Sequence, residues 1–236
     1  MLDAGTMICY NRNINHGRCG RTYELCNINV YSDAQYDAMY RAAASDRRAR
    51  ADRFRHEDDR KRCLCADALA RNMLARAADI APEKINFTYS DKGKPRANLP
   101  LYFNVSHSGE WVLCAVSETP VGADIEQIKP FRAGMVGRYF TDAEAAYIWD
   151  GKPVPGNSPV PEGNVIDPDV CARFYRVWTA KEAYVKMTGT GISTDLSAVK
   201  YDPATQTVCG MPLITPNAPE GYVISIVKKV LPQWGE

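Results

Sequence analysis

The chain has 236 residues and a mass of 26.2 kDa, which suits one large domain or two compact ones. Apolar residues make up 45% and charged residues 24%, as in ordinary globular proteins, so a disordered, collagen-like or coiled-coil chain is excluded. The 29 basic and 28 acidic residues give a net charge of +1, which gives no sign of a nucleic-acid or membrane partner. We therefore expect any basic site to be local.

The N-terminal residues lack the basic and apolar regions of a signal peptide, so we expect none. No apolar run approaches the roughly 18 residues that span a bilayer. Eight cysteines are too few for a disulfide scaffold in a chain of this length, and no C-x-x-C occurs. These features predict a cytoplasmic protein with reduced, partly buried thiols.

The first elements are a strand and a long helical region. Residues 25–31 alternate in the manner of a strand. Ser32 offers a helix N-cap, and Gln35 follows in the first turn. The pattern is then helical to about Ala78, with a break near residues 55–56.

Residues 42–62 of this helical region contain eight basic and five acidic residues, a local excess of +3. A solvated helix face with i,i+4 ion pairs explains such a run as well as an anion site does. The run by itself therefore indicates no ligand.

Short strands are predicted next, in an antiparallel meander with turns at 91–95 and 106–109. The strands are expected at 87–90, 101–105, 111–116 and 121–126.

A helix is predicted from Asp142 to about Trp149, capped by Thr141, and a proline-rich exposed loop at 151–168. Another helix is expected from about residue 170 to 188, ended by Gly189, with strands at 198–201 and 222–227. This order predicts an α+β protein with two lobes of similar size.

Asp124 and Glu126 are separated by one residue of a strand, so both carboxylates leave the same face. Adjacent carboxylates repel one another and resist desolvation, and a hard divalent ion such as Mg²⁺ would neutralise them. An exposed edge strand with two solvated acids is an equal alternative for this pair alone.

The helix at 170–188 adds a third carboxylate. Trp178, Glu182 and Lys186 recur every four residues and share one face, and the tryptophan indicates that this face is partly buried. Glu182 with Lys181 and Lys186 near the strand acids would form a metal–polyphosphate site. The alternative is an ordinary glutamate–lysine pair on a surface helix.

His107 stands between Ser106 and Ser108 at a predicted turn, where it is either a plain polar residue or part of an anion cradle. No G-x-S-x-G elbow occurs, and the glycines at 189 and 191 lack the lysine of a P-loop.

Taken together, the motifs resemble those of the surfactin-synthetase-type 4′-phosphopantetheinyl transferases. Four motifs occur in the family's order, at 93–95 (GKP), 103–109 (FNVSHSG), 121–126 (VGADIE) and 174–191 (FYRVWTAKEAYVKMTGTG). The resemblance extends to residues 53–62 and 138–144, and so covers about residues 45–195.

The resemblance implies a monomer with the family's pseudo-dimeric fold, in which each lobe is a small antiparallel sheet packed on a long helix. The lobes would be residues 1–119 and 120–236, with the active site in the cleft between them. It implies an enzyme that moves phosphopantetheine from coenzyme A to a serine of an acyl- or peptidyl-carrier protein and releases adenosine 3′,5′-bisphosphate.

The resemblance also implies residue roles. Asp124, Glu126 and Glu182 match the ligands of Mg²⁺, for which Mn²⁺ is an alternative, and Glu182 also matches the base toward the carrier serine. Lys186 matches a pyrophosphate contact that can protonate the leaving group. The remaining coenzyme A contacts would be Lys181, Ser106 and His107 at phosphates, Lys94 and Pro95 at adenine, and Arg47, Arg50, Arg53 and Arg62 at the 3′-phosphate.

The chain departs from the family at Ala123, which is smaller than the usual residue, and in the longer loop at 151–168. Four apolar residues are candidates either for contact with the carrier or for the core: Ile128, Phe131, Met135 and Phe140.

Two other functions are kept as alternatives. One is a Mg²⁺-dependent nuclease or phosphodiesterase built on Asp124 and Glu126, against which the near-neutral charge and Ile128 speak. The other is a non-catalytic protein that binds coenzyme A or a carrier, against which the intact acids and Lys186 speak.

Overall fold

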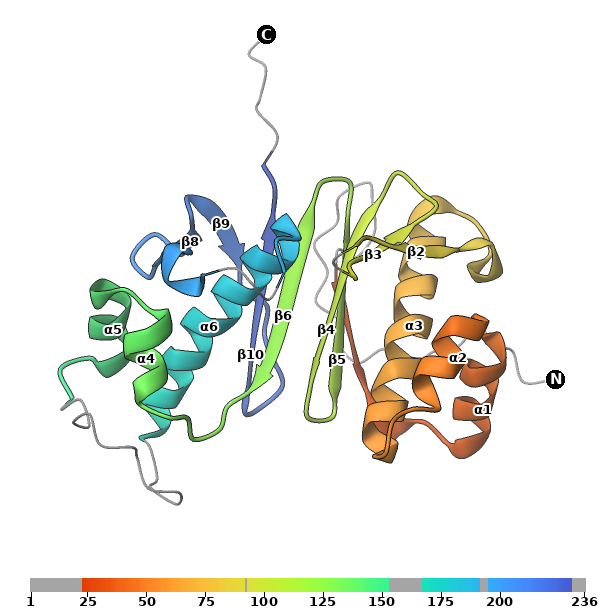
Figure 1. Ribbon diagram of the computed structural model, residues 1–236, viewed down its shortest axis with the longest axis horizontal. Coiled ribbons are helices and arrows are strands. Elements are labelled where there is room, and N and C mark those ends of the chain that lie inside the picture. The colour runs from red at the N-terminus through yellow and green to blue at the C-terminus, as the bar shows by residue number, and fades with distance from the viewer. Residues whose placement is uncertain (1–22, 92, 153–166, 192–194, 231–236) are drawn as a thin grey trace, which may run out of the picture. The chain divides into compact units, whose positions relative to one another are not determined.

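The computed structural model describes residues 23–91, 93–152, 167–191 and 195–230 (Figure 1). The chain divides into two compact units, with the boundary between Pro120 and Val121. Helices and antiparallel sheets occur in both units, which confirms the mixed class predicted from the sequence. The pseudo-dimeric arrangement and the cleft remain predictions.

The N-terminal unit contains three α-helices and five strands among its described residues. Its elements are β1 (Tyr23–Asn27), η1 (Ile28–Val30), α1 (Asp33–Ala42), α2 (Ser45–Ala51), α3 (Glu57–Ala78), η2 (Pro82–Lys84), β2 (Phe87–Tyr89), β3 (Pro95–Ala97), β4 (Tyr102–Ser108) and β5 (Trp111–Ser117).

The predicted start of the helical region is confirmed, because Ser32 and Gln35 form a reciprocal capping box at α1. The predicted break is also confirmed, between α2 and α3, but a second break, between α1 and α2, was not predicted. The strand predicted at 25–31 is too long. The side chain of Asn27 accepts a hydrogen bond from the backbone N–H of Asn29 at 2.8 Å, and this bond turns the chain into η1.

Strands β1, β5 and β4 form one antiparallel sheet, in that order, and α3 packs on its face (Figure 1). Val112, Cys114 and Val116 alternate along β5 and lie in one apolar cluster with Leu69 and Met73 of α3. Hydrophobic burial on this face fixes α3 against the sheet.

Two predictions about the strands are wrong. Residues 106–108 are part of β4, and the chain turns at Gly109, whose φ of 54° favours glycine. The meander also does not continue into the next strand. Within the described residues, β6 (Val121–Gln127) pairs with the distant β10 (Tyr222–Lys228), whereas the partners of β5 are β1 and β4.

The C-terminal unit has one five-stranded antiparallel sheet in the order β6-β10-β9-β8-β7. Its remaining described elements are α4 (Gly134–Tyr139), α5 (Asp142–Trp149), α6 (Pro168–Thr188), η3 (Leu196–Ala198), β7 (Tyr201–Asp202), β8 (Thr207–Val208) and β9 (Met211–Ile214).

The capped helices of this unit match the sequence prediction. Thr141 and Glu144 form a capping box at α5, and Gly189 ends α6 with a φ of 71°. The sequence analysis missed α4, β8 and β9, which are short. The strand predicted at 198–201 is wrong, because η3 ends at Ala198 and β7 begins only at Tyr201. Most of the predicted proline-rich loop, residues 153–166, lies outside the described residues.

An aromatic cluster joins the residues on either side of α4 to α5 and α6. The rings of Phe131 and Phe174 stack with centroids 3.8 Å apart, and Phe140 lies 5.3 Å from Phe174. Phe131 and Phe140 are buried, so core packing accounts for both, whereas Ile128 and Met135 are only partly buried.

In the described part of the chain, no helix has the length and apolar character needed to cross a membrane. The described cysteines are free thiols; all are buried except Cys209.

Candidate active site

The closeness of β6 to α6 depends on Gly122. A Cβ atom at this position would lie 1.9 Å from the carbonyl oxygen of Ala183 and 2.4 Å from the backbone nitrogen of Met187. Only glycine permits this approach. Because side chains alternate along a strand, Asp124 and Glu126 share the face of Gly122 and are directed toward α6.

Strand β10 supports these acids from the side. Its Ser225 is paired with Asp124 and its Val223 with Glu126. The hydroxyl of Ser225 is fully buried and shares a 2.8 Å hydrogen bond with the hydroxyl of Thr179 on α6. This bond fixes the helix over the pair of strands that carries the acids.

Lys186 and Glu182 of α6 complete an acidic site. The Lys186 ammonium donates to Oδ1 of Asp124 at 2.5 Å, and the side chains are 30% and 3% exposed. Burial raises the pKa of Glu182 above its ordinary value, and the negative charges of Asp124 and Glu126 raise it further, whereas Lys186 lowers it. The three carboxylates are thus close enough to repel one another electrostatically.

The chemistry of this donor set fits Mg²⁺. Carboxylate oxygens are its preferred protein ligands, and the ion usually takes only one or two of them together with phosphates and water. Among the described residues no group of three histidine, cysteine or acidic side chains is arranged as a ready metal cage. Asp124, Glu126 and Glu182 are the residues that would hold the ion.

Lys181 has a different place from the one predicted. Its side chain is fully buried, and its ammonium lies 2.6 Å from a carboxylate oxygen of Glu144. It also donates to the carbonyl oxygens of Tyr139 and Leu196 at 2.9 and 3.1 Å. The three N–H donors of the Lys181 ammonium thus have three acceptors inside the unit. None is left for the predicted contact with a phosphate.

In the N-terminal unit, Arg62 lies between α3 and the β4–β5 turn. Its guanidinium donates to the carbonyl oxygen of Gly109 at 2.5 Å and to Asp59 at 2.6 Å. The bond from Arg62 lowers the pKa of the Asp59 carboxyl, and the charges of His56 and His107 contribute. The structure therefore places Arg62 against the turn that directly follows the β4 segment with His107.

Ser106 and His107 point to opposite faces of β4, because they are consecutive residues of a strand. His107 is exposed, whereas Ser106 is buried. The two predicted phosphate contacts therefore face opposite sides of the strand.

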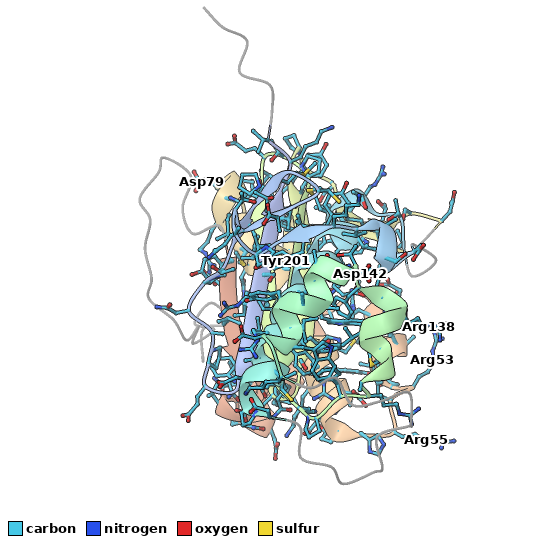
Figure 2. The ribbon with its side chains drawn as sticks, turned by 90° about the vertical axis from the view of Figure 1, so that its left-hand side faces the viewer. Arg53, Arg55, Asp79, Arg138, Asp142 and Tyr201 are labelled. Atoms are coloured by element: carbon cyan, nitrogen blue, oxygen red, sulfur yellow. The ribbon has the colours of Figure 1, made fainter. Side chains whose placement is uncertain are left out.

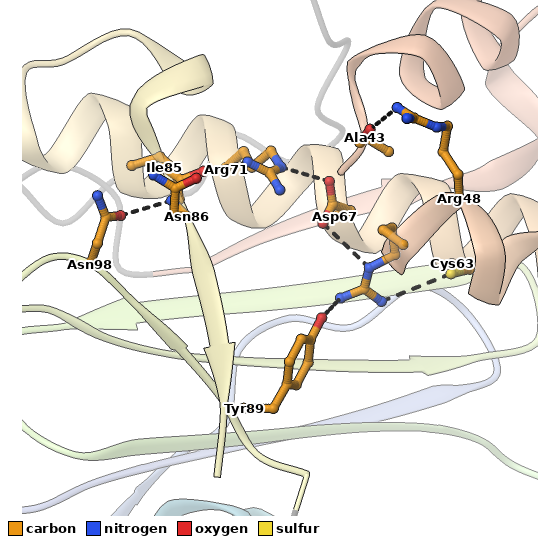
Figure 3. Close-up of polar contacts among 10 residues, drawn as sticks. Ala43, Arg48, Cys63, Asp67, Arg71, Ile85, Asn86, Tyr89 and Asn98 are labelled. Carbon is orange, nitrogen blue, oxygen red and sulfur yellow. Dashed lines mark hydrogen bonds and ion pairs between the residues drawn. The ribbon is translucent and has the colours of Figure 1, made fainter. Parts of the chain in front are cut away.

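Arg47 belongs to a polar network that fixes α2 to α3 and β2. Its guanidinium pairs with Asp67 at 3.4 Å and donates to the hydroxyl of Tyr89 at 3.0 Å, and Figure 3 labels these two partners. Asp67 is buried and also pairs with Arg71 at 2.7 Å, and Arg71 donates to the carbonyl oxygen of Ile85. The contacts of Arg47 are those of a structural residue.

The other predicted coenzyme A contacts are more open. Arg50 and Arg53 are exposed, and Figure 2 shows the Arg53 side chain extending away from the ribbon. Lys94 and Pro95 lie at the β2–β3 turn, where the Lys94 backbone N–H donates to the hydroxyl of Ser90 at 3.0 Å. Burial lowers the pKa of the Lys94 ammonium.

Sequence reasoning missed Gly122 and Glu144 as determinants of this site. Gly122 precedes the acids within its motif, but only the packing of α6 shows why a side chain is excluded there. The capping pattern of Thr141 and Glu144 is visible in the sequence, whereas the pairing of Glu144 with Lys181 depends on tertiary structure.

Comparison with known proteins gives a consistent result for both units. Residues 120–226 match the 4′-phosphopantetheinyl transferase superfamily, and residues 31–119 match the N-terminal part of 4′-phosphopantetheinyl transferases.

Three curated relatives are similar over most of the chain. A 4′-phosphopantetheinyl transferase of Bacillus subtilis is 32% identical over 71% of this chain and 69% of its own length. The psf-1 enzyme of Bacillus pumilus is 36% identical over 65% of this chain and 60% of its own length. The Sfp enzyme of Bacillus subtilis strain 168 is 32% identical over 65% of this chain and 63% of its own length. With these matches to the paired domains and the acid-and-lysine site between β6 and α6, the chain belongs to the Sfp-type 4′-phosphopantetheinyl transferases, a family of enzymes.

Proposed function

We propose that this protein transfers the 4′-phosphopantetheine group of coenzyme A to a serine of an acyl- or peptidyl-carrier protein, with Mg²⁺ or Mn²⁺ and with release of adenosine 3′,5′-bisphosphate. The observation that carries the proposal is the gathering of Asp124, Glu126, Glu182 and Lys186 between β6 and α6. Membership in this family of enzymes speaks against both the nuclease and the non-catalytic alternatives.

The proposed reaction joins the serine hydroxyl oxygen to the phosphorus that carries pantetheine and breaks the bond from that phosphorus to the bridging oxygen of the pyrophosphate. When bound, Mg²⁺ supplies positive charge that neutralises the pyrophosphate oxygens. Glu182, on the face of α6 that also carries Lys186, would accept the serine proton, directly or through water. Lys186, partly exposed at the edge of the acidic site, would contact the leaving phosphate and supply its proton.

The N-terminal unit would recognise the nucleotide part of coenzyme A. Arg62 and His107 are the proposed phosphate contacts. Ser106, which is buried on the other face of β4, would contribute only from that face. Arg50 and Arg53 are exposed and would add attraction for the 3′-phosphate, and the turn at 94–95 would contact adenine. Arg47 and Lys181 are not part of this proposed contact set, because their cationic groups are held by Asp67 and Glu144.

The test is the intact mass of an apo carrier domain after incubation with this protein, coenzyme A and Mg²⁺. We expect the mass to increase by one phosphopantetheine, and EDTA to abolish the increase. Asp124→Asn should remove at least ~99% of the rate, in line with the loss of a group that stabilises the transition state. The matched control Asp169→Asn changes an exposed acid in the first turn of α6 and should leave the rate unchanged. No mass increase with acyl- and peptidyl-carrier domains would contradict the proposal.

A further inference from the structure

The ion pair between Lys186 and Asp124 places a cation where the proposed site needs its metal. The ammonium lies 2.5 Å from Oδ1 of Asp124, and that carboxylate is almost completely buried. Glu126 shares the face of Asp124 on β6, and Glu182 shares the face of Lys186 on α6, so both add negative charge on this side. A partly buried acidic cluster requires positive charge, and in this conformation Lys186 provides part of it.

The Asp124 carboxylate cannot bind the Lys186 ammonium and a metal ion at the same time with full strength. A magnesium ion binds carboxylate oxygens at about 2.0–2.1 Å, so an ammonium group on the same carboxylate would repel the ion at close range. The Lys186 side chain is 30% exposed and flexible, so its ammonium can move into solvent or to a phosphate oxygen. Lys181 has no such freedom, because it is fully buried among three acceptors.

We infer that Lys186 is an internal counter-cation that neutralises Asp124 in the free protein and competes with the metal ion for that carboxylate. Arrival of the metal displaces the ammonium and makes it available to a phosphate group. A phosphate ligand that holds the ammonium in turn removes the competitor and strengthens metal binding. This coupling rests on the proposed function, since it uses the same metal and phosphate site.

The first experiment is calorimetric titration of the free protein with Mg²⁺ alone, without coenzyme A. Lys186→Met should bind the ion about tenfold more tightly than the unchanged protein, because a charged hydrogen bond no longer competes. The control Lys200→Met removes one charge from an exposed lysine in the same unit and should leave the affinity within about twofold. Equal or weaker binding by Lys186→Met overturns the inference but leaves the proposed function standing, provided that the unchanged protein binds Mg²⁺.

A second measurement follows the lysine itself in the unchanged protein. The NMR signal of the Lys186 side-chain methylene next to the ammonium, assigned with the Lys186→Met variant, should shift when Mg²⁺ is added without phosphate ligand. The Lys181 signal should stay fixed, because its ammonium pairs with Glu144 inside the unit. A Lys186 signal that is unchanged at saturating Mg²⁺ overturns the displacement. If no variant binds Mg²⁺, both the inference and the proposed metal role fail, and the carrier assay then reports on transfer separately.

Discussion

Helix α6 carries two lysines, each paired with a carboxylate from another element, and the surroundings of the two ion pairs differ. Lys181 and Glu144 are 2.6 Å apart, and their side chains are 0% and 1% exposed. Lys186 and Asp124 are 2.5 Å apart, but the lysine side chain is 30% exposed. The first pair also receives a 2.7 Å hydrogen bond from the backbone N–H of Tyr201 and contacts two carbonyl oxygens, so its polar groups are used within the unit.

The second pair is part of a group in which negative charge predominates. Asp124, Glu126 and Glu182 face one lysine, and the pKa of Glu182 is raised above its ordinary value, by burial first and then by the charge of Asp124. The two ion pairs thus have similar N–O distances but different roles. A closed, balanced pair holds elements together, whereas an open, unbalanced pair is ready to exchange its cation for a ligand.

The largest effect is expected at the closed pair. Lys181→Met would leave the Glu144 carboxylate buried without its cation, which costs about 3–5 kcal/mol of unfolding free energy. The double variant Glu144→Gln/Lys181→Met should recover more than half of that loss, because neither partner then carries an unpaired charge. Urea unfolding followed by circular dichroism measures both. A loss below about 1 kcal/mol for Lys181→Met, as for a surface pair, would show that the pair is not closed.

The next effect concerns the close approach that brings the acids to α6. Gly122→Ala places a methyl group against backbone atoms of Ala183 and Met187, so strand and helix must separate, at a cost of roughly 1–3 kcal/mol. Gly134→Ala is the matched control, because a Cβ atom there meets nothing within 4 Å. Thermal unfolding should show a lower Tm for the first variant only. Equal Tm values for the two variants would contradict the predicted contact.

The smallest effect tests the charge imbalance at the open pair. The folded protein holds the Glu182 proton to higher pH than the unfolded chain does, so folding stability falls as pH rises through this raised pKa. In metal-free buffer above that pKa, Glu182→Gln should therefore be more stable than the unchanged protein by about 1 kcal/mol, or about 3 °C in Tm.

This advantage should disappear below about pH 4.3, the ordinary pKa of glutamate, where both folded and unfolded chains are protonated. Tm measured across this pH range in the presence of EDTA checks the sign. A Glu182→Gln variant that is less stable than the unchanged protein at high pH would show that the carboxylate is stabilised rather than repelled at its position.

The sequence predicted the features that depend on neighbouring residues. The cap Thr141 and the terminal Gly189 determine helix ends through local hydrogen bonds and backbone conformation, and these predictions are confirmed. The i,i+4 spacing of Glu182 and Lys186 likewise predicted that both share a face, and the structure places both near Asp124.

The features that the sequence did not predict depend on distant contacts. The pairing of β6 with β10 joins residues about a hundred positions apart, whereas strand order along the chain favoured β5. Lys181 and Lys186 look equivalent in the sequence, and only the position of Glu144 on another helix distinguishes them. Tertiary packing therefore decides which lysine is structural.

The most direct test of this distinction is the rate of carrier modification by two variants, each corrected for the fraction of folded protein. We expect Glu144→Gln/Lys181→Met to keep kcat within about threefold, because neither side chain touches substrate. We expect kcat of Lys186→Met to fall by roughly 100-fold or more. The opposite order, with the double variant inactive and Lys186→Met active, would contradict the assignment of the two lysines.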